Sequence, residues 1–210
     1  MSTAADERNI LRFRIHAATR VLVVVAGPNG AGKSTFVQDV LQPLEITLVN
    51  PDALARALFP DAPPIAAYEA ARAADLVRGD LIERGVSFCM ETVFSDPEGA
   101  KVEFLRDAQQ RGYTVMLIFI GLDDSDLSLG RVVRRVQKGG HDVPDDKLKS
   151  RFPRTLANLA NALTFVDYAM VYDNSSGEEP YRFVAELHNG KIVRRGTTQP
   201  DWWTSLRAKP

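Results

Sequence analysis

The sequence predicts an α/β domain of three layers, in which a parallel sheet lies between two layers of helices. Between residues 21 and 172, five unbroken apolar runs of strand length alternate with segments whose apolar residues recur at helical spacing. Unbroken apolar strands are typical of a parallel sheet that is buried on both faces, and their alternation with helices is typical of βαβ units. The 210 residues suffice for one such domain but not for two.

The elements follow in order from this pattern. The predicted strands are 21–26, 46–49, 86–90, 114–120 and 168–172, and the predicted helices are 33–41, 66–84, 97–111 and 124–138. After residue 172 the pattern changes, because 182–188 and 191–195 flank Asn189-Gly190, a pair favoured in two-residue hairpin turns. We therefore expect one domain over residues 1–210, with a small C-terminal antiparallel hairpin at about 181–196 as an appendage.

Composition excludes several classes of protein. The 26 basic residues nearly balance the 27 acidic ones, which argues against a protein that coats nucleic acid. Cys89 is the only cysteine and lies in an apolar run, so we expect a buried strand residue, no internal disulfide and no zinc site built from thiolates. The sequence shows neither a signal-peptide pattern nor an apolar run of about 18 residues, so we expect a cytoplasmic protein that does not span a membrane.

The stretch 26–35 reads AGPNGAGKST and directly follows the first predicted strand. It fits the phosphate-binding pattern Gly-x-x-x-x-Gly-Lys-Ser, in which backbone N–H groups surround an anion and the next helix adds the positive end of its dipole. An ordinary glycine-rich turn is the alternative, but the preceding strand and the following helix favour a phosphate loop. The predicted ATP-binding residues are Gly27, Pro28, Asn29, Gly30, Ala31, Gly32, Lys33, Ser34 and Thr35. Among them, Lys33 would reach the β- and γ-phosphates and Ser34 would bind Mg²⁺.

Two carboxylates follow strands at the edge where a parallel sheet binds ligands. Asp52, in Asn50-Pro51-Asp52, is either a general base that faces the γ-phosphate or a surface residue in the first turn of a helix that Pro51 starts. Glu91, followed by Thr92, ends the third strand as a ligand to substrate or metal, or as a solvated strand end.

Basic residues share one face of the helix predicted at 124–138. Arg131, Arg134, Arg135 and Lys138 have i, i+3, i+4 and i+7 spacing, and Gly139-Gly140 then breaks the helix. A basic face that ends at a Gly-Gly hinge suits a lid, at about 131–154, that closes over phosphates. A solvated charged helix is the alternative. For His141 we expect a place in the hinge, because it lacks neighbours at metal-ligand spacing.

Together these segments resemble the zeta-toxin family of P-loop kinases, over about residues 21–175. The resemblance is carried by Gly-Pro-Asn-Gly-Ala-Gly-Lys-Ser-Thr (27–35), Asn-Pro-Asp (50–52), Glu-Thr-Val-Phe-Ser (91–95), Arg-Val-x-x-Arg-Val (131–136), Gly-Gly-His-x-Val-Pro (139–144), Arg-Phe-x-Arg-x-Leu-x-Asn-Leu (151–159) and Tyr-Asp-Asn-Ser (172–175). The segments look most like the compact chromosomal branch, often labelled as predicted ABC-type ATPases. The absence of a Ser-Gly-Gly-Gln run contradicts that label.

The resemblance implies a fold like that of nucleoside and shikimate kinases, with a five-stranded parallel sheet and a lid. It implies ATP- and Mg²⁺-dependent phosphorylation of a hydroxyl on UDP-N-acetylglucosamine or a related nucleotide sugar, and an antitoxin as a possible partner. It makes Asp52 the base and Lys33, Arg131 and Arg135 catalytic. The remaining candidates that it implies are Arg151 and Arg154 as lid arginines near ATP, Arg72 on the phosphates of the substrate, and Glu91, Thr92 and Ser95 in the substrate site.

Two other functions stay open from the sequence alone. A polynucleotide, RNA or other nucleotide kinase shares the phosphate loop and the base, but the near-neutral charge makes nucleic acid an unlikely partner. A non-catalytic ATP-binding regulatory module would need neither a base nor a lid. A motor or switch ATPase is disfavoured, because two residues separate the strand 114–120 from the acidic pair Asp123-Asp124.

Overall fold

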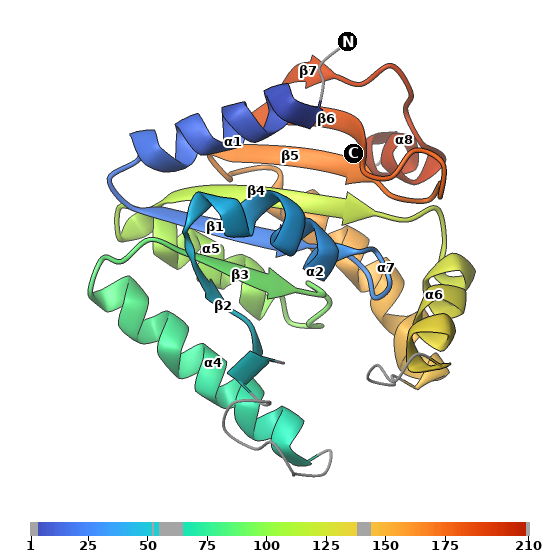
Figure 1. The fold of residues 1–210 in the computed structure, drawn as a ribbon, viewed down its shortest axis with the longest axis horizontal. Helices are drawn as coiled ribbons and strands as arrows, with labels where there is room; N and C mark the ends of the chain where they lie inside the picture. Colours follow the sequence, from blue (N-terminus) through green and yellow to red (C-terminus); the bar gives the residue numbers. More distant parts are fainter. Residues whose placement is uncertain (1–3, 52, 55–64, 138–143, 209–210) are drawn as a thin grey trace.

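The computed structural model describes residues 4–51, 53–54, 65–137 and 144–208. Within these residues, one mixed sheet of seven strands has the order β2-β3-β1-β4-β5-β6-β7 (Figure 1). The strands are β1 (Val21–Ala26), β2 (Thr47–Val49), β3 (Phe88–Thr92), β4 (Thr114–Gly121), β5 (Tyr168–Asp173), β6 (Arg182–His188) and β7 (Lys191–Arg195). The helices are α1 (Ala4–Ala17), α2 (Lys33–Phe36), α4 (Ile65–Glu83), α5 (Ala100–Gln110), α6 (Ser125–Gln137), α7 (Asp145–Ala162) and α8 (Asp201–Ala208).

The five predicted parallel strands are present, and the C-terminal hairpin corrects the prediction of a five-stranded sheet. Strands β1 to β5 pair in parallel. Strand β6 pairs antiparallel with β5, and β7 pairs antiparallel with β6, so the hairpin extends the sheet to seven strands. The physical reason is that β5 would otherwise expose an unpaired edge, which β6 covers.

Helices cover both faces of the sheet, as the three-layer prediction requires. On one face, the odd-numbered residues of β1 pack with α1 and α2, and this cluster includes the fully buried Cys89, as predicted. On the other face, the even-numbered residues of β1 pack with α4, α5, α7 and α8. Because both faces are covered, the parallel strands carry apolar residues at consecutive positions.

Among the described residues, three α-helices lie beyond those that the sequence predicts: α1, α7 and α8. Helix α7 runs through the second half of the predicted lid and continues past Pro153. The helix predicted at 33–41 is α2 followed by a π-helical stretch, Val37–Leu41. None of the described helices is both long and apolar enough to cross a membrane.

A buried carboxylate ties α1 to the added hairpin. Glu186 on β6 is 5% exposed and accepts hydrogen bonds from Arg14 of α1 at 2.6 Å and from Arg194 of β7 at 3.1 Å. His188 lies 2.9 Å from the same carboxylate. Burial raises the pKa of Glu186, but the bond to His188 and the charges of both arginines outweigh burial, and the pKa lies below its ordinary value of 4.5.

We expect Glu186→Gln to lower the free energy of unfolding by about 3–5 kcal/mol at neutral pH, because it leaves two arginines without a carboxylate. Since the folded-state pKa is depressed, the contribution of Glu186 is present above pH 4.5 and is lost as the pH falls through the folded-state value. As the pH falls from neutral through the folded-state pKa of Glu186, the free energy of unfolding should therefore decrease less in the variant than in the wild type.

Denaturant unfolding at several pH values measures both effects. The matched control is Glu103→Gln, which removes an exposed pair with Arg106 at 3.5 Å and should change stability by less than about 1 kcal/mol. Equal losses in the two variants would contradict a buried role for Glu186.

Candidate active site

A cleft of about 760 Å³ lies beside the phosphate loop and the carboxyl end of β3, between α4, α6 and α7. Its volume is within the range of small-molecule sites. The predicted site residues that line it are Asn29, Gly30, Gly32, Lys33, Ser34, Thr35, Glu91, Thr92, Ser95, Arg131, Arg135, Arg151 and Arg154. Asp52 lies outside the described residues, although Asn50 and Pro51 line the cleft. Lys138, Gly139-Gly140 and His141 of the predicted lid also lie outside them.

Two positions explain why the phosphate loop needs glycine. A Cβ at Gly27 would lie 2.1 Å from the carbonyl oxygen of Ile120 on β4. Gly32 has a φ of +88°, and a Cβ there would lie 2.8 Å from Nδ2 of Asn174 and 2.9 Å from the hydroxyl of Tyr181. Side chains at either position would displace the loop from the elements that support it.

Side chains donate hydrogen bonds to the carbonyl groups at the start of the phosphate loop and so support it. The Lys33 Nζ donates to the carbonyl oxygen of Pro28 at 2.9 Å, and Lys33 is only 7% exposed. The Ser128 hydroxyl of α6 donates to the carbonyl oxygen of Asn29 at 2.7 Å. Because C=O and N–H point in opposite directions in a trans peptide plane, these bonds also orient the amides that follow.

The loop after β5 holds the other end of the phosphate loop. Asn174 is buried, and its Nδ2 donates to the carbonyl oxygen of Ala31 at 2.8 Å. The Tyr181 hydroxyl donates to the carbonyl oxygen of Gly32 at 2.9 Å. Burial raises the pKa of Tyr181, which keeps this hydroxyl protonated as a donor.

Arg131 joins α6 to both loops. Its Nη2 donates to the carbonyl oxygen of Ser175 at 3.2 Å, and its Nη1 makes a longer contact of 3.5 Å with the carbonyl oxygen of Gly30. Together with the preceding bonds, these contacts engage every carbonyl from Pro28 to Gly32 with a side chain. The loop is therefore shaped before any anion binds.

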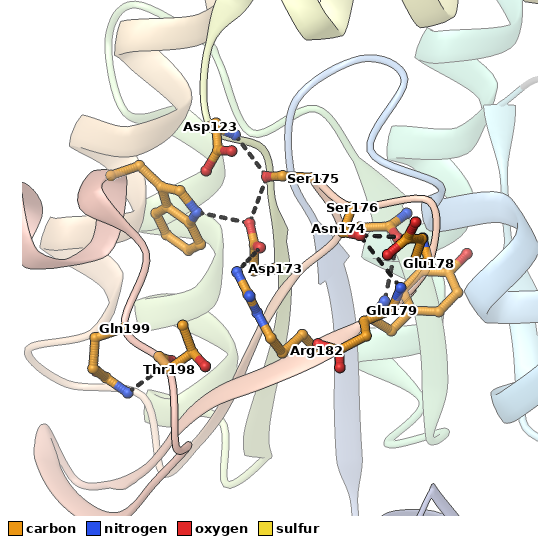
Figure 2. A network of polar contacts seen from close by, with 12 residues as sticks. Asp123, Asp173, Asn174, Ser175, Ser176, Glu178, Glu179, Arg182, Thr198 and Gln199 are labelled. Carbon is orange, nitrogen blue, oxygen red and sulfur yellow. Dashed lines mark hydrogen bonds and ion pairs between the residues drawn. The ribbon is translucent and has the colours of Figure 1, made fainter.

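Figure 2 shows the polar network that fixes the loop after β5. Buried Asp173 accepts a hydrogen bond from the Ser175 hydroxyl at 2.6 Å and one from Arg182 at 2.7 Å. Nε1 of Trp202 in α8 donates to the same carboxylate at 3.0 Å. The Ser175 hydroxyl in turn accepts the backbone N–H of Asp123, just before α6. The C-terminal elements are thereby connected to the start of the helix that carries Arg131.

Glu91 lies beside the residue predicted to bind Mg²⁺. The Ser34 hydroxyl donates to the two carboxylate oxygens of Glu91 at 3.0 and 3.1 Å, and Nδ2 of Asn50 is 3.3 Å from one of them. The pairing of β1 with β3 places Glu91 opposite Val25, two residues before the loop. A hydroxyl and a carboxylate in contact form an oxygen donor set that fits Mg²⁺, which is usually bound through one or two carboxylates and substrate phosphates.

The segment after β3 shapes the cleft wall by hydrogen bonds to its backbone. The Thr92 hydroxyl accepts the N–H of Phe94, which has a φ of +62° although it is not glycine. From α7, Thr155 donates to the carbonyl oxygen of Val93 at 2.9 Å, and Asn158 donates to that of Phe94 at 3.0 Å. Positive φ in a bulky residue is unfavourable and persists where surrounding bonds hold it, as at functional sites.

Four arginines of α6 and α7 face this cleft. Arg131 and Arg135 are one turn apart on α6, and Arg151 and Arg154 lie on α7, which packs against α6. Arg134 is exposed and does not line the cleft. Of the basic face predicted on α6, Arg131 and Arg135 therefore line the cleft, whereas Arg134 points to solvent.

The structure does not bring Arg72 to the cleft. Arg72 is exposed on α4, whereas Ala71, Asp75 and Arg78 of the same helix line the cleft. Sequence reasoning missed Asp75 and Arg78, as well as Asp96 and Lys101, which also line the cleft; Nζ of Lys101 donates to Asp75 at 2.8 Å. The available signal was the i, i+3 spacing of Asp75 and Arg78, which is also typical of a solvated ion pair.

Comparisons with solved structures confirm the fold. The PezAT chromosomal toxin–antitoxin system of Streptococcus pneumoniae aligns with a TM-score of 0.59 at 14% identity, over 98% of this chain and 89% of that one. The AvrRxo1-ORF1:ORF2 complex with ATP aligns with a TM-score of 0.57 at 14% identity, over 89% and 68%. A Pnkp1/Rnl/Hen1 RNA repair complex aligns with a TM-score of 0.53 at 14% identity, over 68% and 46%.

The sequence comparisons identify the family of the chain. An uncharacterized protein of Haemophilus influenzae is 28% identical over 146 residues, which is 68% of this chain and 100% of that protein. The family profile described as zeta toxin matches residues 10–182, from α1 to the first residue of β6. Since this match spans most of the chain and the cleft has the phosphate loop of a P-loop kinase, the protein belongs to the zeta toxin family.

Proposed function

We propose that the protein transfers the γ-phosphoryl group of ATP to a hydroxyl of UDP-N-acetylglucosamine or a related nucleotide sugar. The observation that carries the proposal is that one cleft holds the phosphate loop, the Ser34–Glu91 pair and four arginines. A loop that binds phosphates does not by itself distinguish hydrolysis from transfer, but arginines on a facing wall suit a migrating phosphoryl group. The nucleotide sugar as acceptor rests on the family resemblance.

In this proposal, Ser34 and Glu91 hold Mg²⁺, which neutralises charge on the β- and γ-phosphates when bound. Lys33 lies at the end of the loop that binds the same phosphates. Arg131 and Arg135 supply planar guanidinium groups that match the charge spread over the transferred oxygens. Thr92 and Ser95 would contact the acceptor from the wall after β3.

Asp52 is the proposed general base. Its carboxylate takes the proton from the acceptor hydroxyl, and the acceptor oxygen forms a new bond to the γ-phosphorus. The bond from the γ-phosphorus to the bridging oxygen breaks, and ADP leaves with that electron pair. The position of Asp52 directly after Asn50 and Pro51, which line the cleft, supports this role.

A protein partner is part of the proposal. The solved PezAT structure is of a toxin–antitoxin system, and the AvrRxo1-ORF1 chain was solved in complex with ORF2. By analogy, an antitoxin would bind this chain in the cytoplasm.

Transfer of label from γ-³²P-ATP tests the proposed reaction. The purified protein is incubated with UDP-N-acetylglucosamine, with RNA or DNA carrying a 5′-hydroxyl, and with no acceptor. We expect label on the nucleotide sugar. Label on the nucleic acid would instead establish a polynucleotide kinase, label only in inorganic phosphate would establish an ATPase, and bound ATP without turnover would establish a regulatory module.

We expect Asp52→Asn to reduce phosphoryl transfer by a factor on the order of 10²–10⁴ while ATP binding is retained, because the amide keeps the shape but cannot accept the proton. Single-turnover transfer and ATP titration measure the two quantities separately. Parallel losses in both would assign Asp52 to metal binding or to structure.

We expect Arg131→Ala to lower kcat by a factor on the order of 10²–10³ and to raise the KM for ATP far less, because the charge that it meets develops in the transition state. Arg131→Lys should restore little, since lysine lacks the planar fork. Arg134→Ala, on the same helix but outside the cleft, is the matched control. An unchanged kcat in Arg131→Ala would leave Arg131 with only a structural role.

We expect Tyr181→Phe to weaken ATP binding by about 3- to 10-fold, the usual worth of one hydrogen bond, because the carbonyl of Gly32 loses its donor. Equilibrium titration with ATP measures the change. Tyr168→Phe is the control, because Tyr168 makes its contacts through its ring, with Arg14 and His188. Equal ATP affinity in wild type and Tyr181→Phe would show that the loop keeps its shape without this bond.

A further inference from the structure

Asp173, the last residue of β5, is a buried carboxylate that is held from three parts of the chain. It is 1% exposed. Oδ1 accepts a hydrogen bond from Nε1 of Trp202 in α8 at 3.0 Å and one from the Ser175 hydroxyl at 2.6 Å. Oδ2 accepts a bond from Nη2 of Arg182 at 2.7 Å, and this arginine also supplies the opposite charge (Figure 2). Because both oxygens are engaged, the carboxylate has a fixed orientation and fixes its partners in turn.

The indole of Trp202 reaches Asp173 because the neighbouring strand carries no side chain at that point. Gly121, the last residue of β4, is the pairing partner of Asp173. A Cβ at Gly121 would lie 2.2 Å from Cζ2 of the indole, so a larger residue would displace the ring. The ring also packs on Phe119, with 5.7 Å between the centroids. Packing therefore places the indole N–H at the carboxylate, although α8 lies beyond residue 182, where the match to the zeta toxin profile ends.

Ser175 connects this carboxylate to Arg131. Its hydroxyl donates to Asp173 and accepts the backbone N–H of Asp123 at 2.9 Å, so it joins the end of β5 to the turn before α6. The carbonyl oxygen of Ser175 accepts the hydrogen bond from Nη2 of Arg131 at 3.2 Å. One nitrogen of the guanidinium is therefore bound to a carbonyl whose position depends on Asp173. A misplacement of about 1 Å, caused far from the chemistry, can cost a factor on the order of 10² in rate.

We infer that Asp173 and Trp202 are positioning residues for Arg131, although neither lines the cleft. The inference rests on the proposed phosphoryl transfer, in which Arg131 meets charge that develops in the transition state. Loss of a positioning residue should therefore lower kcat more than it raises the KM for ATP. A purely structural role would instead lower the melting temperature and leave the kcat of the folded protein unchanged.

Two single hydrogen bonds of Asp173 can be removed with little change of shape, by Ser175→Ala and by Trp202→Phe. Turnover is measured as the loss of the γ-phosphate from ATP, summed over label on every acceptor and in inorganic phosphate. We expect each variant to lower kcat by about 3- to 10-fold, the usual worth of one hydrogen bond, with the KM for ATP nearly unchanged. Since Trp202 is buried, a thermal melt accompanies each variant. If Trp202→Phe does not fold, Ser175→Ala gives the decision, because Ser175 is only half-buried.

Each variant has a matched control in its chain neighbour. The Ser176 hydroxyl accepts the N–H groups of Glu178 and Glu179 within the same loop, so Ser176→Ala removes a hydroxyl without touching Asp173. Trp203 contacts Trp202 and Arg207 through its ring, so Trp203→Phe keeps the kind of contact that it makes. Both controls should have the kcat of the wild type.

A double-mutant cycle with Arg131→Ala tests whether the effect passes through Arg131. In that background Ser175→Ala should change kcat by less than about twofold, because the group that is positioned has been removed. An equal factor in both backgrounds would overturn the inference. A raised KM with an unchanged kcat would also overturn it, since the effect would then lie on the phosphate loop, which Asn174 holds through the carbonyl of Ala31.

NMR spectroscopy of the guanidinium ¹⁵N nuclei follows Arg131 without any turnover, and its signal is assigned by its loss in Arg131→Ala. Ser175→Ala and Trp202→Phe should shift this signal, and Ser176→Ala should not. An unchanged signal in folded Ser175→Ala would overturn the inference. Failure of the proposed function looks different: the signal would shift in the same variants, but no label from ATP would appear on a nucleotide sugar.

Discussion

Five successive carbonyl groups of the phosphate loop, from Pro28 to Gly32, are engaged by side chains, and the rest of the site depends on this arrangement. The donors come from Lys33, from α6 and from the loop after β5. A peptide plane whose carbonyl is held cannot easily rotate its N–H group, so the amides are oriented before an anion arrives. Dipoles that need no reorganisation stabilise charge more effectively than mobile ones.

The same principle applies to the wall opposite the loop. Thr155 and Asn158 of α7 bond to carbonyl oxygens of the segment after β3, including that of Phe94 with its positive φ. These bonds tie the helix that carries Arg151 and Arg154 to the segment that contains Ser95. The arginines proposed to contact ATP and the serine proposed to contact the acceptor therefore lie on elements that are bonded to each other. A change in one wall is therefore expected to affect binding at the other.

The sequence predicted those features that leave a continuous pattern along the chain. The parallel strands were predicted because both of their faces are covered, which leaves continuous apolar runs, and the phosphate loop because its glycines are required by close contacts at Gly27 and Gly32. The pairing of β6 with β5 was not predicted, because the change of pattern after residue 172 indicated a hairpin but not the sheet edge to which that hairpin adds. The positions of Arg78 and Glu186 were also missed, since a charged residue is usually exposed and its burial depends on partners from other elements. The family resemblance pointed to Arg72, which is exposed, and not to Arg78.

The added C-terminal elements contribute to the site through Arg131. Trp202 of α8 and Arg182 of β6 hold the Asp173 carboxylate, Asp173 holds Ser175, and the Ser175 carbonyl accepts a bond from Arg131. A guanidinium has five N–H donors in a rigid fork, so Arg131 can contact phosphate oxygens without releasing this carbonyl. A lysine has a single flexible ammonium group, so it could not contact the Ser175 carbonyl and the phosphate oxygens at once with the same geometry. In the proposed reaction, arginine at this position would therefore meet two demands at once: support of the loops, through its contacts with Gly30 and Ser175, and stabilisation of the transferred group.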